Sequence, residues 1–199
     1  MVDKPGSSDC NVSPMDNLSV NDAFEIALKN ARIALDQIEV PCGAVLCTNV
    51  EDENSNSVRR VLFQSHNRAN ATRNPTMHAE FQILRDLEAK KLDMFENDSE
   101  RQSFIKSLEL FVTMEPCIMC IGALRIVGIP KIYFNLRNPR FGGCGSIVNG
   151  HSLEFVNPNC IPQLIQIENE EIYELLKKFY KQTNFKCPEG KRRDKSKRN

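Results

Sequence analysis

The sequence lacks the features that would mark a membrane protein, a secreted protein or a repeat protein. No stretch approaches the ~18 consecutive apolar residues that a membrane-spanning helix needs. Residues 1–17, MVDKPGSSDCNVSPMDN, are polar and lack the hydrophobic segment of a secretory signal, so we expect a flexible leader on an intracellular protein. No internal repeat is present. The length of 199 residues fits one domain with extended ends, or at most two small domains.

The net charge of the chain is zero, but the positive and negative side chains are unevenly distributed along it. Residues 181–199 contain eight Lys or Arg side chains and two acidic ones, which gives this segment a charge of +6. The remainder of the chain therefore carries −6. An acidic body with a basic tail suggests that the tail meets a polyanionic partner.

The chain contains eight cysteines. In a reducing compartment, cysteines are expected to be thiols or metal ligands rather than a disulfide framework. Most of them need no function, because a free cysteine is often a small buried apolar residue.

Hydrophobic periodicity and turn signals predict an alternation of helices and strands. Ser19, with Asp22 three residues later, is typical of a helix start. The polar segment TNVEDENSNS between the first two strands is typical of a hairpin loop, and residues 93–106 form a connection with some helix. We expect helices over 20–37, 76–91, 116 to about 127 and 169–182, and strands over 42–47, 59–66, 108–114 and 131–135, with 163–167 as the candidate for a fifth strand.

A hairpin followed by alternating elements predicts the α/β class. We expect a three-layer α/β/α sandwich, in which a mixed sheet of about five strands carries helices on both faces. We place this domain at residues 18–182, between the leader at 1–17 and a basic tail at 183–199.

Two short motifs provide a set of metal ligands. TMHAEF contains His78 and Glu80, and EPCIMC contains Cys117 and Cys120. The two cysteines are three residues apart at a predicted helix start, so their sulfurs can converge with His78 on one ion, and a His/Cys/Cys set suits zinc. Both motifs lie at predicted helix N-termini, where the positive end of the helix dipole stabilises thiolates.

Glu80 follows the histidine by two residues, so it lies near the metal but turns away from the ligating direction. A carboxylate in that place can move protons between water and a leaving group. Three protein ligands plus water are typical of a catalytic zinc site, whereas a structural site needs a fourth ligand. Cys144, Cys160 and His151 are candidates for the fourth ligand, although none has ligand-like spacing, and a structural zinc knot stays an alternative.

The combination of H-x-E with P-C-x-x-C is the signature of zinc nucleobase deaminases. From about residue 20 onward the chain resembles the cytidine-deaminase-like fold and, within it, the tRNA adenosine deaminases, in particular the catalytic subunit of the eukaryotic heterodimeric enzyme. The resemblance rests on VPCGAVL, HNRANATRNPTMHAE, LFVTMEPCIMCIGALRIVGIPKIYF, NPRFGGCGSIVN and LLKKFYKQ.

The resemblance implies a reaction and a role for each site residue. His78, Cys117 and Cys120 would bind one catalytic Zn²⁺, and Glu80 would shuttle protons during hydrolytic conversion of the wobble adenosine in tRNA to inosine. The residues implied to contact the substrate are Asn67 on the base, Ala79 through its backbone N–H or C=O, Val40 as a pocket wall, and Phe141 stacked on a flanking nucleotide. Simpler roles are a turn for Asn67 and packing for Val40 and Phe141.

The resemblance also implies a partner, a paralogous subunit that lacks the shuttle glutamate; a homodimer is the less favoured assembly. We expect localisation in the cytoplasm and nucleus. The tail side chains expected to contact tRNA are Lys191, Arg192, Arg193, Lys195, Lys197 and Arg198, whose composition equally suits a nuclear localisation signal or a solvated segment. Two alternative functions are a deaminase of cytosine or free nucleotides and an inactive zinc-binding partner subunit.

Overall fold

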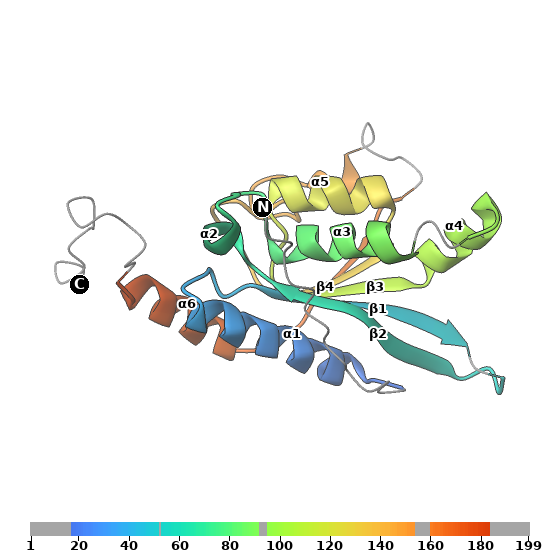
Figure 1. Ribbon diagram of the computed structural model, residues 1–199, viewed down its shortest axis with the longest axis horizontal. Helices are drawn as coiled ribbons and strands as arrows, with labels where there is room; N and C mark the ends of the chain where they lie inside the picture. Colours follow the sequence, from blue (N-terminus) through green and yellow to red (C-terminus); the bar gives the residue numbers. More distant parts are fainter. Residues whose placement is uncertain (1–16, 52, 92–94, 154–159, 184–199) are drawn as a thin grey trace, which may run out of the picture.

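One five-stranded mixed sheet organises the chain in the computed structural model, which describes residues 17–51, 53–91, 95–153 and 160–183 (Figure 1). The strand order is β2-β1-β3-β4-β5. The first pairs, β2 with β1 and β1 with β3, are antiparallel, whereas β3, β4 and β5 run parallel. The strands are β1 (Gly43–Glu51), β2 (Ser57–His66), β3 (Leu108–Met114), β4 (Lys131–Leu136) and β5 (Gln163–Gln166).

Helices cover both faces of this sheet, which confirms the predicted α/β/α sandwich. Helices α1 (Val20–Asp36) and α6 (Glu171–Lys181) lie on one face, and α3 (Ala79–Lys91) and α5 (Ile118–Val127) lie on the other (Figure 1). Each face buries its own apolar cluster, one under α1 and one between the sheet, α3 and α5. No helix among the described residues is long and apolar enough to cross a membrane.

The first helix begins and packs as the sequence predicts. Ser19 and Asp22 form a reciprocal capping box at its N-terminus. The helix backbone then approaches β1 closely at Gly43, where a Cβ atom would lie only 2.1 Å from the carbonyl oxygen of Ala27. A glycine is therefore required at the start of β1, because only a residue without a side chain allows α1 to pack this close to the sheet.

The structure changes several predicted boundaries. Strands β1 and β2 extend further into the predicted hairpin loop, because their outer halves are partly exposed and lack a continuous apolar run. The two site helices begin later than predicted, with α3 at Ala79 and α5 at Ile118. The short α2 (Ala69–Thr72) was not predicted, whereas α4 (Asp98–Lys106) is the helix expected within the polar connection.

The leader and the basic tail fall almost entirely outside the described residues, which begin at position 17 and end at position 183. Their assignment as separate segments stays a prediction.

Candidate metal centre and its surroundings

The three predicted ligands come from two strand–loop–helix units. His78 is the residue immediately before α3, and Cys117 is the N-cap of α5, with an extended backbone. Cys120 lies one turn into α5 and is fully buried. Both helices therefore direct their N-terminal ends toward the same point at the carboxyl end of β3, where the dipoles favour negatively charged sulfur.

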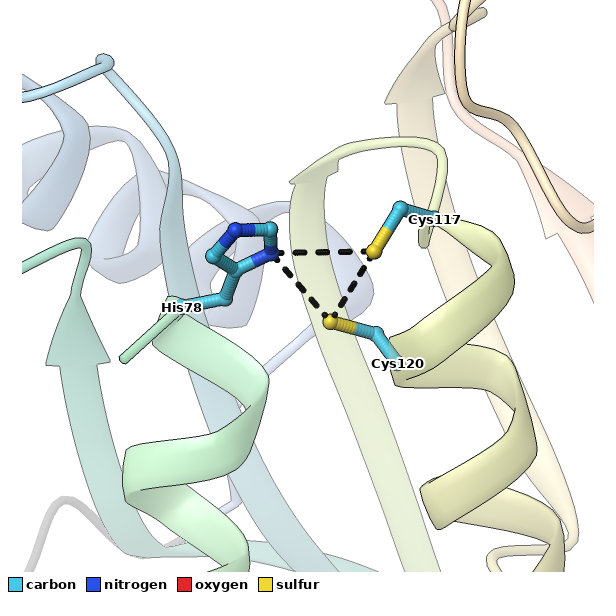
Figure 2. Close-up of side chains that lie close together, drawn as sticks. All are labelled: His78, Cys117 and Cys120. Carbon is cyan, nitrogen blue, oxygen red and sulfur yellow. Dashed lines mark hydrogen bonds between the residues drawn. The ribbon is translucent and has the colours of Figure 1, made fainter. Parts of the chain in front are cut away.

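The ligand atoms converge with spacing that fits one ion (Figure 2). His78 Nδ1 lies 3.6 Å from Cys117 Sγ and 3.5 Å from Cys120 Sγ, and the two sulfurs are 3.5 Å apart. A tetrahedral zinc with ordinary bond lengths would require about 3.6 Å between nitrogen and sulfur and about 3.8 Å between two sulfurs. The three ligand atoms therefore fit a zinc ion once the two sulfurs move slightly further apart.

A hydrogen bond couples the two sulfurs of this cluster. The hydrogen bonds with Cys120 and His78 outweigh burial and lower the pKa of Cys117 to about 4. The hydrogen bond with Cys117, together with burial, raises the pKa of Cys120 far above its usual value. A metal ion would bind both sulfurs as thiolates, because the thiolate is the ligating form.

Glu80 lies beside this cluster in the first turn of α3 and is only 2% exposed. Burial, and secondarily the charge of Cys117, raises the pKa of its carboxyl group. Its Oε2 atom is buried without a hydrogen-bond partner among the described residues. A buried carboxylate with an unused oxygen is expensive to maintain, which indicates that a ligand or substrate group completes its hydrogen bonding.

Asn67 and Ala79 are joined by a hydrogen bond at the entrance to α3. The Ala79 N–H donates to Asn67 Oδ1 at a distance of 3.0 Å, and both residues are buried. Of the two backbone groups of Ala79 predicted to meet a base, the N–H is therefore already engaged by Asn67. Asn67 keeps its amide NH₂ as a donor for a ligand.

Val40 lies half-buried in the segment between α1 and β1. The preceding residue, Glu39, is buried and accepts hydrogen bonds from the backbone N–H groups of Asn70 and Ala71 at 3.0 and 2.7 Å. Glu39 thereby connects the Val40 segment to α2, which follows Asn67. This contact was not predictable from the sequence, because α2 is too short to show helical periodicity.

The glycine-rich loop carries Phe141, whose side chain is 58% exposed. The Arg140 guanidinium lies over its ring, 5.6 Å from the centroid. The exposed side chain does not support the packing role that was the simpler alternative, and it is compatible with stacking on a ligand.

The fourth-ligand candidates do not join the metal cluster. Among the described residues, His78, Cys117 and Cys120 form the one group of three or more possible ligands that surround a common point. Cys144 is buried in the glycine-rich loop. The Cys160 thiol donates a hydrogen bond to the Ile129 carbonyl, and the Nδ1 atom of His151 is buried. The predicted tail residues Lys191, Arg192, Arg193, Lys195, Lys197 and Arg198 lie outside the described residues.

Sequence reasoning missed Glu115, which precedes Pro116 and Cys117. It is 1% exposed and accepts hydrogen bonds from the backbone N–H groups of Asn138, Cys144 and Ser146. Burial alone would raise the pKa of this carboxyl, but these bonds lower it overall. The one available signal was a carboxylate immediately after an apolar strand and two residues before a metal ligand.

Comparison with known proteins places the chain in a family. The family described as "Cytidine and deoxycytidylate deaminase zinc-binding region" matches residues 19–136, so the chain belongs to it. The geometry and the family together confirm the prediction of a hydrolytic deaminase.

Three similar proteins show which kinds of deaminase this chain resembles. The chain is 37% identical over 172 residues to tRNA-specific adenosine deaminase 2 of Xenopus tropicalis, covering 85% of this chain and 93% of that protein. It is 31% identical to a solved structure from studies of A-to-I editing by tRNA:A34 deaminases, with a TM-score of 0.53 and coverage of 75% and 98%. A guanine deaminase from Nitrosomonas europaea shares the fold alone, at 19% identity, a TM-score of 0.61 and coverage of 85% and 88%.

Proposed function

We propose that this chain is the catalytic subunit of a heterodimeric, zinc-dependent deaminase that converts the wobble adenosine of tRNA to inosine. The observation that carries the proposal is the three-ligand cluster with the unpartnered carboxylate oxygen of Glu80 beside it. The relatives named for tRNA-specific adenosine deamination support the choice of substrate.

His78, Cys117 and Cys120 would hold the zinc ion. When bound, zinc would supply Lewis acidity to a water molecule in the fourth position. Glu80 would take the two protons of a water molecule in turn and pass one to the adenine ring and the other to the departing amino group, so that oxygen replaces nitrogen at C6 and ammonia leaves. The raised pKa of Glu80 suits this role, because a carboxyl group that titrates closer to neutral pH both accepts and returns protons readily.

The residues around Glu80 would hold the purine. The Asn67 amide NH₂ donates to an acceptor on the base, the Ala79 carbonyl accepts from it, and Val40 forms an apolar wall. The base must leave its stack to reach a buried carboxylate, and a single-stranded anticodon loop permits this more cheaply than a duplex. Phe141 would stack on a neighbouring nucleotide.

The outer face of α5 supports a subunit interface. Ile118, Met119 and Ile126 are 51%, 36% and 71% exposed, and Gly122 between them has open space around its Cα. Apolar side chains on a site helix suit a paralogous deaminase-like subunit whose own shuttle glutamate is absent. The presence of Glu80 here makes this chain the active member of the pair rather than an inactive partner.

The decisive experiment uses the chain co-purified with its native partner. Mass spectrometry of a tRNA with adenosine at the wobble position should detect inosine, while the same tRNA with cytidine there, and free adenosine or cytidine, should stay unchanged. Activity confined to free nucleotides or to cytidine would overturn the tRNA adenosine proposal. Absence of activity on every substrate would favour an inactive partner subunit.

The basic tail has its own test. Replacing six of its cations, Lys191, Arg192, Arg193, Lys195, Lys197 and Arg198, with Gln should weaken tRNA binding and flatten its salt dependence, because fewer counterions are released. An unchanged slope with lost nuclear fluorescence of a tagged chain would make the tail a localisation signal. We propose that the intact chain is present in both cytoplasm and nucleus, which the same microscopy measures.

A further inference from the structure

Glu115 connects the metal-ligand segment to a loop that reaches the surface. Its carboxylate accepts from Asn138 N at 2.9 Å, from Cys144 N at 3.0 Å and from Ser146 N at 3.1 Å, and the Ser146 hydroxyl also donates to it. All four donors belong to residues 138–146, which we call the clamped loop. One buried carboxylate thus joins both ends of this loop.

The clamped loop also packs directly on the start of α5. Ile118 N–H donates to the Phe141 carbonyl at 3.0 Å, and Gly143 N–H donates to the Pro116 carbonyl at 2.8 Å. The packing leaves no room for a side chain at Gly142, where a Cβ atom would lie 2.5 Å from a Glu115 carboxylate oxygen. The loop therefore wraps around the carboxylate and lies against the residues that flank Cys117.

Between its two clamped ends the loop presents an aromatic ring and a cation. Phe141 and Arg140 are both exposed, and the guanidinium lies over the ring. Arg140 makes no ion pair with another residue in the described part of the chain, so its charge is available to an external anion. A cation for phosphate beside a ring for stacking is the combination that binds single-stranded nucleic acid.

We propose that Glu115 is a positioning residue for substrate binding: it holds the clamped loop so that Arg140 and Phe141 meet the nucleotides beside the target base. The proposal rests on the proposed function for the identity of the substrate. The proposal distinguishes substrate binding from the chemical step, because none of the four Glu115 hydrogen bonds involves Glu80 or a metal ligand. Loss of the Glu115 interactions should therefore weaken tRNA binding more than it slows the bound reaction.

Glu115→Gln is the main test in the assembled complex. The Gln amide can still accept from Cys144 and Ser146, but its NH₂ group opposes the Asn138 N–H donor. We expect one zinc per chain, a kcat within about threefold of the wild type, and a KM for tRNA raised roughly tenfold, which corresponds to about 1.4 kcal/mol. Ser146→Ala, which removes one donor and leaves the carboxylate in place, should shift KM in the same direction by less.

A double-mutant cycle distinguishes positioning from general support of the fold. In a background with Arg140→Ala and Phe141→Ala, Glu115→Gln should add little further increase in KM, because its effect acts through those two side chains. A fully additive increase, or a parallel loss of kcat and zinc, would overturn the proposal and make Glu115 a scaffold residue.

Hydrogen exchange of the clamped loop gives a readout that does not depend on the substrate. In Glu115→Gln the Asn138 amide, whose acceptor oxygen is replaced by an NH₂ group, should lose protection, while β3 stays protected. If the wild-type complex fails to deaminate tRNA, the proposed function and the substrate role of the clamp both fail, yet the exchange data still decide whether Glu115 holds the loop. Unchanged exchange would refute the clamp itself.

Discussion

The two ends of β3 bury carboxylates in opposite ways. At its start, Glu109 pairs with Arg59 at 2.6 Å and Lys131 at 2.9 Å, so charge is compensated by charge. At its other end, Glu115 is compensated by backbone N–H groups, and nearby Glu80 keeps an oxygen that no described residue satisfies. We call these the ionic end and the site end.

The difference shows which carboxylate is free to react. Ion pairs and hydrogen bonds lower the pKa of Glu109 and Glu115 despite their burial. Burial raises the pKa of Glu80, whose partners do not offset it. All three are at most 2% exposed, so exposure alone would not separate them. The fold stabilises the charge of two carboxylates and leaves the third suited to exchange protons.

The largest effect is expected from Glu80→Gln. Removing the proton carrier should lower deamination by about 10²–10⁴-fold, the usual contribution of general acid–base catalysis, while zinc content stays at one per chain. Inosine formation and metal analysis measure the two quantities. Glu88→Gln, an exposed change on the same helix, is the matched control and should keep full activity. Retained activity in Glu80→Gln would refute the shuttle assignment.

The second test compares cysteines from the two ends. Cys120→Ala should lose the bound zinc and lower the melting temperature, because metal binding stabilises the folded state. Cys47→Ala should keep the bound zinc, because this thiol lies at the ionic end, near Arg59 and Glu109. Burial there raises the pKa of the Cys47 thiol to about 12. Metal analysis with thermal unfolding measures both. Retained zinc in Cys120→Ala would exclude the proposed ligand set.

These contrasts also show what the sequence could predict. The convergence of His78, Cys117 and Cys120 was predictable because each motif is short, and local spacing places its side chains relative to a helix start. The sheet was predictable because buried strands such as Leu108–Met114 are apolar runs. Glu115 was not predictable, because three of its four donors are backbone N–H groups 23 to 31 residues away, and a backbone N–H has no residue type.

The third prediction concerns the ionic end. Glu109→Gln should lower the free energy of unfolding by about 3 kcal/mol near neutral pH, because Arg59 and Lys131 lose a buried partner. Deamination and zinc content should stay unchanged. Guanidinium chloride denaturation measures the stability, and Glu96→Gln, an exposed carboxylate outside this network, is the control.

The same variant predicts a pH dependence. The pKa of Glu109 is lowered in the folded state from an ordinary value of 4.5, so its stabilisation is present above that pH and is lost as pH falls through the folded pKa. The stability difference between wild type and Glu109→Gln should therefore shrink below about pH 4.5. A constant difference across this range would show that Glu109 contributes by packing and not by charge.

The smallest effect is expected from an exposed ion pair. Arg32 donates two hydrogen bonds to Glu171, at 2.6 and 2.7 Å, and joins α1 to α6, but the side chains are 41% and 39% exposed. Solvent screens such a pair, so Arg32→Gln should cost less than about 1 kcal/mol and lose even this effect at high salt. Denaturation in low and high salt measures it. If Arg32→Gln lowered the free energy of unfolding as much as Glu109→Gln does, bidentate geometry would matter more than burial for these ion pairs. The stabilisation at the ionic end would then come from hydrogen-bond geometry rather than from the exclusion of water.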